Sequence, residues 1–233
     1  MNILALETST EYCSVALWQD GAILARNELA GQKHSEMLMP MLRGLLDEAG
    51  IRLAHCDGIA FGSGPGSFTG VRIACGVAQG LALGADLPVS GISTLLALAQ
   101  GSGHARVIAA LDARMGEIYC AAYERLDEGW KTVCEPGLCK PEDAPDVPCG
   151  DWFCAGSGFA AFPEILQKRY AGKLIGMDVG AVPRAADIAA LAALQFARGL
   201  GMDAAQAQPF YLRDKVALKT AERELMAAEK SGK

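Results

Sequence analysis

Histidine, aromatic residues and positive charge are all scarce in this sequence. It has three histidines, 6% aromatic residues and a formal net charge of −6. The histidines, His34, His55 and His104, lie far apart, without the close spacing typical of metal ligands, so we expect surface or capping roles for them. An acidic surface repels the phosphates of nucleic acid, and any nucleic-acid function therefore needs a basic partner chain.

Long apolar runs and targeting signals are missing as well. No apolar run approaches the roughly 20 residues that a membrane span requires. The N-terminus, MNILALETSTEYC, has neither the basic region nor the small-residue cleavage site of a signal peptide. We therefore expect a cytoplasmic protein that makes no membrane contact.

The eight cysteines raise the question of a zinc site or disulfides. C-x4-C pairs are wider than the usual spacing of zinc knuckles, whose turns aim both sulfurs at one metal. We expect free thiols of a reducing compartment, with a metal site as the alternative. Four cysteines lie singly in apolar surroundings and are expected to be buried: Cys13, Cys56, Cys75 and Cys120. The others form two C-x4-C pairs around a proline-rich loop: Cys134 with Cys139, and Cys149 with Cys154.

Apolar periodicity divides the first hundred residues into strands and helices. Asp20 and Gly21, between two β-like runs, form a strong hairpin signal. The helix that follows is expected to begin at Ser35 as cap, to carry Pro40 near its first turn and to stop at Gly50. Strands are predicted over 3–7, 13–19, 22–29, 57–62 and 87–92, and helices over 35–49, 68–83 and 93–100.

The opening pattern then recurs. A strand over 107–112 ends in a carboxylate, a short polar turn follows at 113–116, and a return strand covers 117–124, as at the N-terminus. Such an internal repeat predicts two related α/β lobes, each opening with a β-hairpin, which is the actin, Hsp70 and sugar-kinase (ASKHA) architecture. The predicted lobes are 1–103 and 104–233, with a loop over 136–148, a glycine turn at 156–158, helices over 159–170 and 185–199, and a charged tail over 214–233. The helix over 185–199 is expected to pack back toward the first lobe.

The glycine-rich stretch GSGPGSFTGVRIACGVAQG at 62–80 looks like a phosphate-binding loop. A Walker loop needs a lysine after its last glycine, and this stretch has none. Gly64, Gly66 and Gly70 give G-x-G-x-x-x-G, one residue longer than the dinucleotide fingerprint. What remains is a tight turn that leads into a helix N-terminus, which can hold an anion but need not.

Several stretches together carry a family resemblance: LALETST at 4–10, HSEML at 34–38, GSGPGSFTGVR at 62–72, DARMGEIY at 112–119 and PFYLR at 209–213. The chain resembles the TsaB (YeaZ) family over about residues 1–213, most strongly in the first lobe. Members of that family belong to the bacterial machinery that makes N6-threonylcarbamoyladenosine (t6A) in tRNA.

The resemblance implies a division of labour. TsaB is similar to TsaD, the catalytic threonylcarbamoyltransferase, which binds a metal through an H-x-x-x-H pair on a helix. Read without gaps from PVSG at 88–91, those positions fall on Ser93 and Ala97, which cannot act as imidazole ligands. The resemblance therefore implies a non-catalytic subunit without metal or cofactor. Such a subunit is required for threonylcarbamoyl transfer to N6 of adenosine 37 in tRNAs that read ANN codons.

The resemblance also implies partners. The first two helices, 35–49 and 68–83, would dock on the same helices of TsaD as a four-helix bundle, the ATPase TsaE would join, and tRNA would be met indirectly. Alone, the chain would pair with itself through the same face. Methionine-rich and small-residue faces suit such docking, although part of each helix must pack on its own sheet. The substitution Ala78→Arg is expected to abolish both self-association and TsaD binding and to leave the fold intact. The residues expected to face outward are Met37, Met41, Leu42, Leu45, Val71, Ala74, Ala78 and Leu81.

A nucleotide cleft between the lobes is a further expectation. Glu7 and Asp112 end the two hairpin strands, where kinase relatives hold magnesium or activate water. The alternative is that each carboxylate accepts N–H groups of its own turn. We expect the two turns to face each other and to bind ATP or ADP weakly at most, because neither supplies a lysine. The candidate residues are Glu7, Thr8, Ser9, Asp112, Arg114, Gly156, Ser157 and Gly158.

Two other functions stay open on the residues alone. One is a nucleotide-dependent enzyme of the sugar-kinase class. The other is a peptidase, although Ser9 and Ser67 have no partner base nearby in the sequence. The stretch GSFTG at 66–70 does not complete the G-x-S-x-G of a nucleophile elbow.

Overall fold

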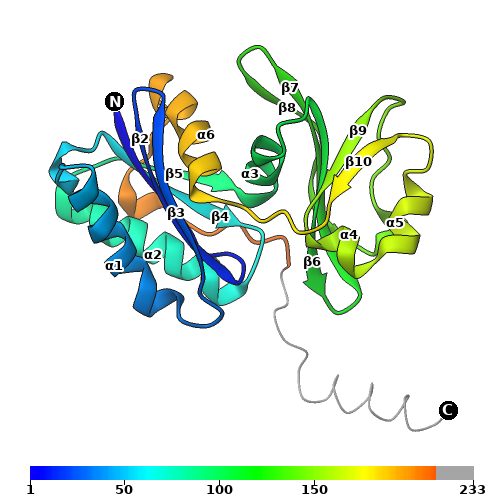
Figure 1. The fold of residues 1–233 in the computed structure, drawn as a ribbon, viewed down its shortest axis with the longest axis horizontal. Coiled ribbons are helices and arrows are strands. Elements are labelled where there is room, and N and C mark those ends of the chain that lie inside the picture. Colours follow the sequence, from blue (N-terminus) through cyan, green and yellow to red (C-terminus); the bar gives the residue numbers. More distant parts are fainter. Residues whose placement is uncertain (214–233) are drawn as a thin grey trace, which may run out of the picture.

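The computed structural model describes residues 1–213, which form two α/β lobes side by side (Figure 1). Each lobe is built on a five-stranded mixed sheet. The predicted tail over 214–233 lies outside the described residues.

The first sheet has the strand order β3-β2-β1-β4-β5. Three antiparallel strands come first, and β4 and β5 then add parallel to β1. Asp20 and Gly21 both have positive φ (47° and 98°), as a two-residue type I′ hairpin turn requires, so the predicted hairpin is confirmed. The strands are β1 Asn2–Glu7, β2 Tyr12–Gln19, β3 Ala22–Leu29, β4 Gly58–Gly64 and β5 Val89–Ser93.

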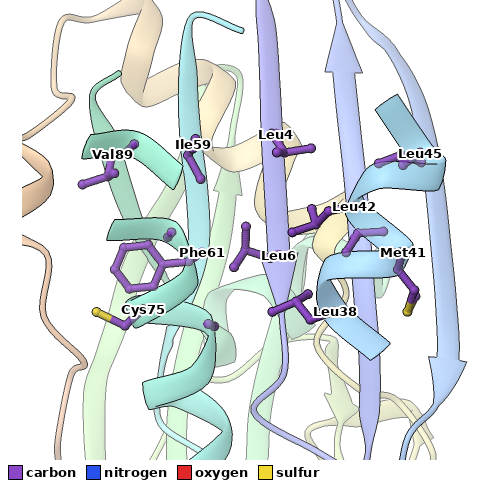
Figure 2. Close-up of a cluster of buried hydrophobic side chains, with 14 of the residues drawn as sticks. Leu4, Leu6, Leu38, Met41, Leu42, Leu45, Ile59, Phe61, Cys75 and Val89 are labelled. Atoms are coloured by element: carbon purple, nitrogen blue, oxygen red, sulfur yellow. The ribbon is translucent and has the colours of Figure 1, made fainter. Parts of the chain in front are cut away.

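Helices cover both faces of this sheet (Figure 1). On one face lie α1 His34–Glu48 and α2 Phe68–Ala85, and the short turn η1 Leu53–His55 precedes β4. Their apolar side chains meet those of β1, β4 and β5 in a closed core, with Leu6, Leu38, Leu42 and Phe61 pointing into it (Figure 2). Burial of this stripe is the main force that holds the two helices on the sheet.

The helix α1 corrects two predictions and confirms a third. The helix begins at His34, and its N-cap residue, Lys33, makes no side-chain cap, so Ser35 is not the cap. The His34 ring instead bonds the carbonyl of Tyr12 at 3.1 Å, which draws the first turn onto β2. Pro40 lies inside the helix rather than in its first turn. At the other end, Gly50 has φ +66°, and the N–H of Ile51 reaches the Leu46 carbonyl at 3.1 Å, as in a Schellman stop.

The second sheet repeats the topology of the first. Its order, β10-β9-β6-β7-β8, matches the first sheet strand for strand, with an antiparallel trio followed by two parallel strands. The predicted pair of related lobes, each opening with a hairpin, is therefore confirmed. The strands are β6 Arg106–Arg114, β7 Glu117–Leu126, β8 Gly129–Cys139, β9 Trp152–Ala155 and β10 Leu174–Asp178.

Some predicted elements of the second lobe are wrong. β8 extends into the stretch predicted as a loop over 136–148, and η2 Pro141–Asp143 interrupts the rest. The helix predicted over 159–170 is split at Phe162, whose ψ of 57° is not helical, into α4 Ser157–Ala161 and α5 Pro163–Arg169. Proline follows that break and favours the first position of a new helix.

Three segments join the lobes. α3 Thr94–Gly101 leads out of the first lobe and packs on the second sheet. α6 Ala185–Ala197 returns and packs on β1, β2 and β4 of the first sheet, on the face opposite α1 and α2 (Figure 1). After η3 Ala204–Gln206, residues 207–213 run along the first lobe to the second hairpin, and we call this segment the strap.

Candidate functional site

The glycine-rich loop covers the beginning of the turn between β1 and β2. Glu7, Thr8 and Ser9 are buried almost completely, at 1%, 0% and 2% exposure. The Thr8 hydroxyl donates to the Gly70 carbonyl at 2.7 Å, and the N–H of Ser67 donates to the Ser9 carbonyl at 2.7 Å. Glu7, Thr8 and Ser9 are therefore closed off from solvent, whereas Thr10 and Glu11 of the same turn are not buried.

The glycines of the loop allow this close contact. A Cβ on Gly70 would lie 1.9 Å from the Thr8 carbonyl oxygen, and one on Gly66 would lie 2.6 Å from the Ser9 Cβ. A Cβ on Gly62 would lie 1.5 Å from the Glu7 carboxylate. Because no side chain fits these positions, the glycines serve to pack the loop on the turn.

Glu7 is left in an unusual state beneath this loop. One carboxylate oxygen accepts the N–H of Ser9, and the other, Oε2, has no hydrogen-bond partner in the described part of the chain. Burial raises the pKa of Glu7 from 4.5 to about 7, although the hydrogen bonds from Ser9 oppose the shift. The carboxyl therefore carries a proton in a large share of molecules at neutral pH.

The second hairpin gathers the remaining cleft candidates. The N–H of Asp112 donates to the Ser157 hydroxyl at 3.1 Å, and the Arg114 guanidinium lies 3.0 Å from the Asp112 carboxylate. Gly156 and Gly158 pack against Ala110 so closely that a Cβ would lie within 2.4 and 2.9 Å of its atoms. The structure thus brings these five candidates together on the second lobe, apart from the enclosed Glu7, Thr8 and Ser9.

The predicted partner face needs a larger correction. Most of its residues point into the core of the first lobe, because the largest apolar stripe of each helix packs on its own sheet. Met37 and Leu81 are half-buried against the same core. The residues wrongly expected to face outward are Met41, Leu42, Leu45, Val71, Ala74 and Ala78, all at 6% exposure or less.

The outward face of α2 is instead a ridge of glycines. Gly76, Gly80 and Gly84 are exposed, and a Cβ on any of them would meet no atom within 4 Å. From Ile73 to Ala85 the helix carries no charged residue. Its length and its mean hydropathy of 1.3 would suffice for a membrane span, yet a third of it is buried within the lobe. The G-x-x-x-G-x-x-x-G spacing was visible in the sequence, but the alanine stripe beside it gave the stronger helical signal.

The strap makes contacts with the first lobe that the sequence did not predict. The N–H of Phe210 donates to the Ser63 carbonyl at 2.7 Å. The Tyr211 hydroxyl accepts from the Arg72 guanidinium at 2.6 Å, and that guanidinium lies 3.4 Å from the centre of the Phe68 ring. The only signal for these contacts was the PFYLR stretch itself, because their partners lie far away in the sequence.

The last described residue, Arg213, ends the strap on the second lobe. It bonds the Ala113 carbonyl at 3.1 Å and pairs with the Glu117 carboxylate at 2.7 Å. It thereby braces the tip of the second hairpin, where Arg114 and Met115 both adopt positive φ (62° and 57°). Such backbone is costly for side-chain-bearing residues, and the surrounding contacts must hold it in place.

The histidines and cysteines are the side chains that most often bind transition metals. His55 caps η1, as expected, by accepting the N–H of Arg52, whereas His34 is buried at 7% exposure and His104 stacks on Phe153. Within residues 1–213 no group of three or more His, Cys, Asp or Glu side chains is placed to hold a metal ion. All eight cysteines are free thiols, and the four predicted to be buried are buried: Cys13, Cys56, Cys75 and Cys120.

Two lobes with one strand order, each opening with a hairpin, define a protein of the actin, Hsp70 and sugar-kinase class. Comparison narrows the class to a family. The model of the family described as "TsaD: tRNA N6-adenosine threonylcarbamoyltransferase" matches residues 26–221. The tRNA threonylcarbamoyladenosine biosynthesis protein TsaB of Escherichia coli is 42% identical, over 94% of this chain and 97% of that protein. The chain belongs to the TsaB (YeaZ) family of tRNA threonylcarbamoyladenosine biosynthesis proteins.

Other relatives agree with this placement. TsaB of Haemophilus influenzae is 40% identical, over 94% of this chain and 96% of that protein. The solved structure of YeaZ from Pseudomonas aeruginosa is 42% identical and superposes with a TM-score of 0.82, covering 91% of this chain and 99% of that chain. A second structure from P. aeruginosa, described as similar to peptidase YEAZ, has a TM-score of 0.84 at 43% identity, with the same coverage of both chains.

Proposed function

We propose that this chain is a non-catalytic, cytoplasmic subunit of the machinery that transfers a threonylcarbamoyl group to N6 of adenosine 37 in tRNAs reading ANN codons. It acts by docking the catalytic subunit TsaD through the outward faces of α1 and α2, and through TsaD it joins the ATPase TsaE. The chain pairs with itself through the same face when TsaD is absent, and it meets tRNA only within the complex.

One observation carries the docking proposal, namely the uncharged glycine ridge on the outside of α2. Gly76, Gly80 and Gly84 recur every four residues and leave the helix backbone open to close approach. Glycine weakens a helix by about 1 kcal/mol relative to alanine, so three on one exposed face are costly unless another helix packs there. Interaxial distances of about 8–10 Å are reached when small residues line such a contact.

The burial of Glu7, Thr8 and Ser9 supports the non-catalytic part of the proposal. A nucleotide-dependent enzyme of this class needs open turns from both lobes around the phosphates. Here the loop over 62–70 covers Thr8 and Ser9, and the Glu7 carboxylate is partly protonated in the core. Any weak binding of ATP or ADP would involve the second lobe, where the Arg114 side chain is 87% exposed.

A reconstituted reaction tests this function. TsaD, TsaE and tRNA are combined with and without this chain, and modified adenosine is scored. We expect no product from the chain alone, none from the mixture without it, and product from the full mixture. Threonylcarbamoyl transfer by the isolated chain would contradict the proposal, and so would full activity without it.

Variants of one glycine test the face. Gly80→Arg places a charge on the ridge without touching the core, and we expect it to stay folded and to abolish both self-association and TsaD binding. Gly80→Ala controls for helix propensity, and Ala197→Arg controls for charge at an exposed position of α6. Ala197→Arg should bind TsaD as the wild type does, and Gly80→Ala, which adds one methyl group to the ridge, should weaken binding far less than Gly80→Arg. Normal binding by folded Gly80→Arg, measured by sedimentation and pull-down, would place the interface elsewhere.

A further inference from the structure

A single positive charge lies at the N-terminal end of the glycine ridge. Arg72 is the only charged residue of α2, and its side chain is exposed. It precedes Gly76 by four residues, which places both on the same face of the helix, one turn apart. A helix that packs along the uncharged ridge therefore meets one cation at this end.

Contacts on two sides hold the Arg72 guanidinium in place. Its Nε donates to the Tyr211 hydroxyl at 2.6 Å, and its central carbon lies 3.4 Å from the centre of the Phe68 ring. The two rings lie 5.9 Å apart. A long arginine side chain loses rotamer freedom when it binds a partner, and here the chain's own contacts have already restricted it.

The far end of the guanidinium stays available. Among residues 1–213, neither Nη group of Arg72 has a hydrogen-bond or ion-pair partner, because the listed bond to Tyr211 uses Nε. Two free Nη groups form the edge that a carboxylate meets through two parallel hydrogen bonds. Phe68 and Tyr211 beside them are 37% and 42% exposed. Arginine and exposed aromatic side chains are typical of the residues that dominate binding energy in protein interfaces.

Charge distinguishes a carboxylate from nucleic acid as the anion that Arg72 meets. Nucleic acid is bound by several lysines and arginines that neutralise phosphates together. Arg72 is alone on its helix, and the chain has a net charge of −6. One arginine at the end of an uncharged ridge is instead complementary to one acidic side chain on a docking helix.

We propose that Arg72 is a specificity-determining residue of the docking face, and that its guanidinium binds an aspartate or glutamate side chain of the partner helix that packs along the ridge. The inference rests on the proposed docking of TsaD and adds the chemistry that TsaD must present. Phe68 and Tyr211 are positioning residues, because they hold the guanidinium and leave its Nη groups unpaired. Since Tyr211 belongs to the strap, the strap contributes to docking through Arg72.

Charge reversal tests this pair in the complex of the full chain with TsaD. Arg72→Glu should weaken TsaD binding at least about thirtyfold, because it replaces an attractive pair with two carboxylates. Each exposed aspartate or glutamate on the docking helices of TsaD is then changed singly to arginine. One of these TsaD variants should bind Arg72→Glu within about threefold of the wild-type affinity. The control Lys168→Glu, at an exposed position of α5 in the second lobe, should bind as the wild type does.

Milder variants test the fork and its positioning. Arg72→Lys keeps the charge but loses the planar fork, and it should weaken binding by about three- to tenfold. Tyr211→Phe removes the hydroxyl that holds Nε and should weaken binding by about threefold. In an Arg72→Gln background the same Tyr211→Phe change should have no effect. Equal effects in both backgrounds would contradict a role of Tyr211 through Arg72.

Gly80→Arg separates this inference from the docking function. If Gly80→Arg abolishes TsaD binding and folded Arg72→Glu binds as the wild type does, docking stands and the inference is overturned. If both variants bind normally, both proposals are wrong. Failure of every TsaD variant to restore binding would also overturn the inference. So would a loss of tRNA affinity by the assembled complex with unchanged TsaD binding, because Arg72 would then meet phosphate. Calorimetry measures the affinities, and circular dichroism checks each fold.

Discussion

At the scale of single residues, Glu7 has the most unusual environment. Its carboxyl lies in the core of the first lobe, where Gly62 leaves just enough room for it and Ile188 of α6 lies nearby. Burial disfavours the charged form, so the proton is held more tightly in the folded chain than in the unfolded one. Stability must therefore depend on pH.

The direction of that dependence follows from the raised pKa. Below the unfolded value of 4.5 both states are protonated, and between 4.5 and about 7 the folded state alone keeps the proton. Stability is therefore greatest at low pH and falls as pH rises through this window, by up to about 3 kcal/mol. Urea unfolding of the wild type between pH 4.5 and 8 should show the loss, and Glu7→Gln should remove most of it.

Asp187 also makes stability fall as pH rises, so its effect must be separated from that of Glu7. Burial raises its pKa from 3.8 to about 6, so its contribution fades at lower pH than that of Glu7. Asp187→Asn should flatten the curve below about pH 6 and leave the upper part of the window in place. An unchanged slope between pH 6 and 7 in Glu7→Gln would show that Glu7 is charged in the folded chain.

Glu7 also shows what the sequence can and cannot predict about the candidate site. Its position at the end of a hairpin strand followed from the local pattern, as did the matching place of Asp112. Its burial did not, because the covering atoms come from Gly62 and Ile188, distant in the sequence. Local periodicity carries no information on which distant loop closes over a turn.

At the scale of elements, α2 is a helix with two different apolar faces. Ala74 and Ala78 lie in the core at 0% exposure, whereas Gly76 and Gly80 lie outside. Helical spacing detects an apolar stripe but does not say whether it meets the chain's own sheet or another chain. For that reason the helix was predicted correctly from the sequence, but the side that it turns outward was not.

The two faces should respond differently to substitution. Ala78 is buried, so Ala78→Arg puts a charge into a closed core. We expect this variant to unfold the first lobe, contrary to the expectation from the sequence. Gly80→Ala fills open space in a helix interior and should raise the free energy of unfolding by about 0.5–1 kcal/mol. Thermal and urea unfolding measure both effects. A stable, folded Ala78→Arg protein would contradict the burial of this face.

Other elements differed in how well the sequence predicted them. The β2–β3 hairpin was predicted because Asp20 and Gly21 specify its turn locally. β9 and β10 were missed, since Trp152–Ala155 and Leu174–Asp178 are short and show little alternation. β9 pairs with β6 and β10 pairs with β9, and these pairings depend on contacts across the second lobe that local propensity does not encode.

At the scale of the whole molecule, the strap connects the lobes through Arg213 and Glu117. Both side chains are largely shielded, at 16% and 31% exposure, and lie 2.7 Å apart. A double-mutant cycle with Arg213→Ala and Glu117→Ala should give a coupling energy of about 0.5–3 kcal/mol. Urea unfolding of the four proteins supplies the numbers. Strictly additive effects would mean that the pair does not hold the lobes together.

The strap also has a mechanical consequence. The chain crosses between the lobes after α3, before α6 and at Arg213 (Figure 1). Two bodies linked by two chain crossings can still turn relative to each other, and a third crossing at a different place restricts that turning. Cutting the chain before Phe210 should therefore loosen one lobe against the other, so that the intact chain moves more nearly as a single rigid part than the cut chain does.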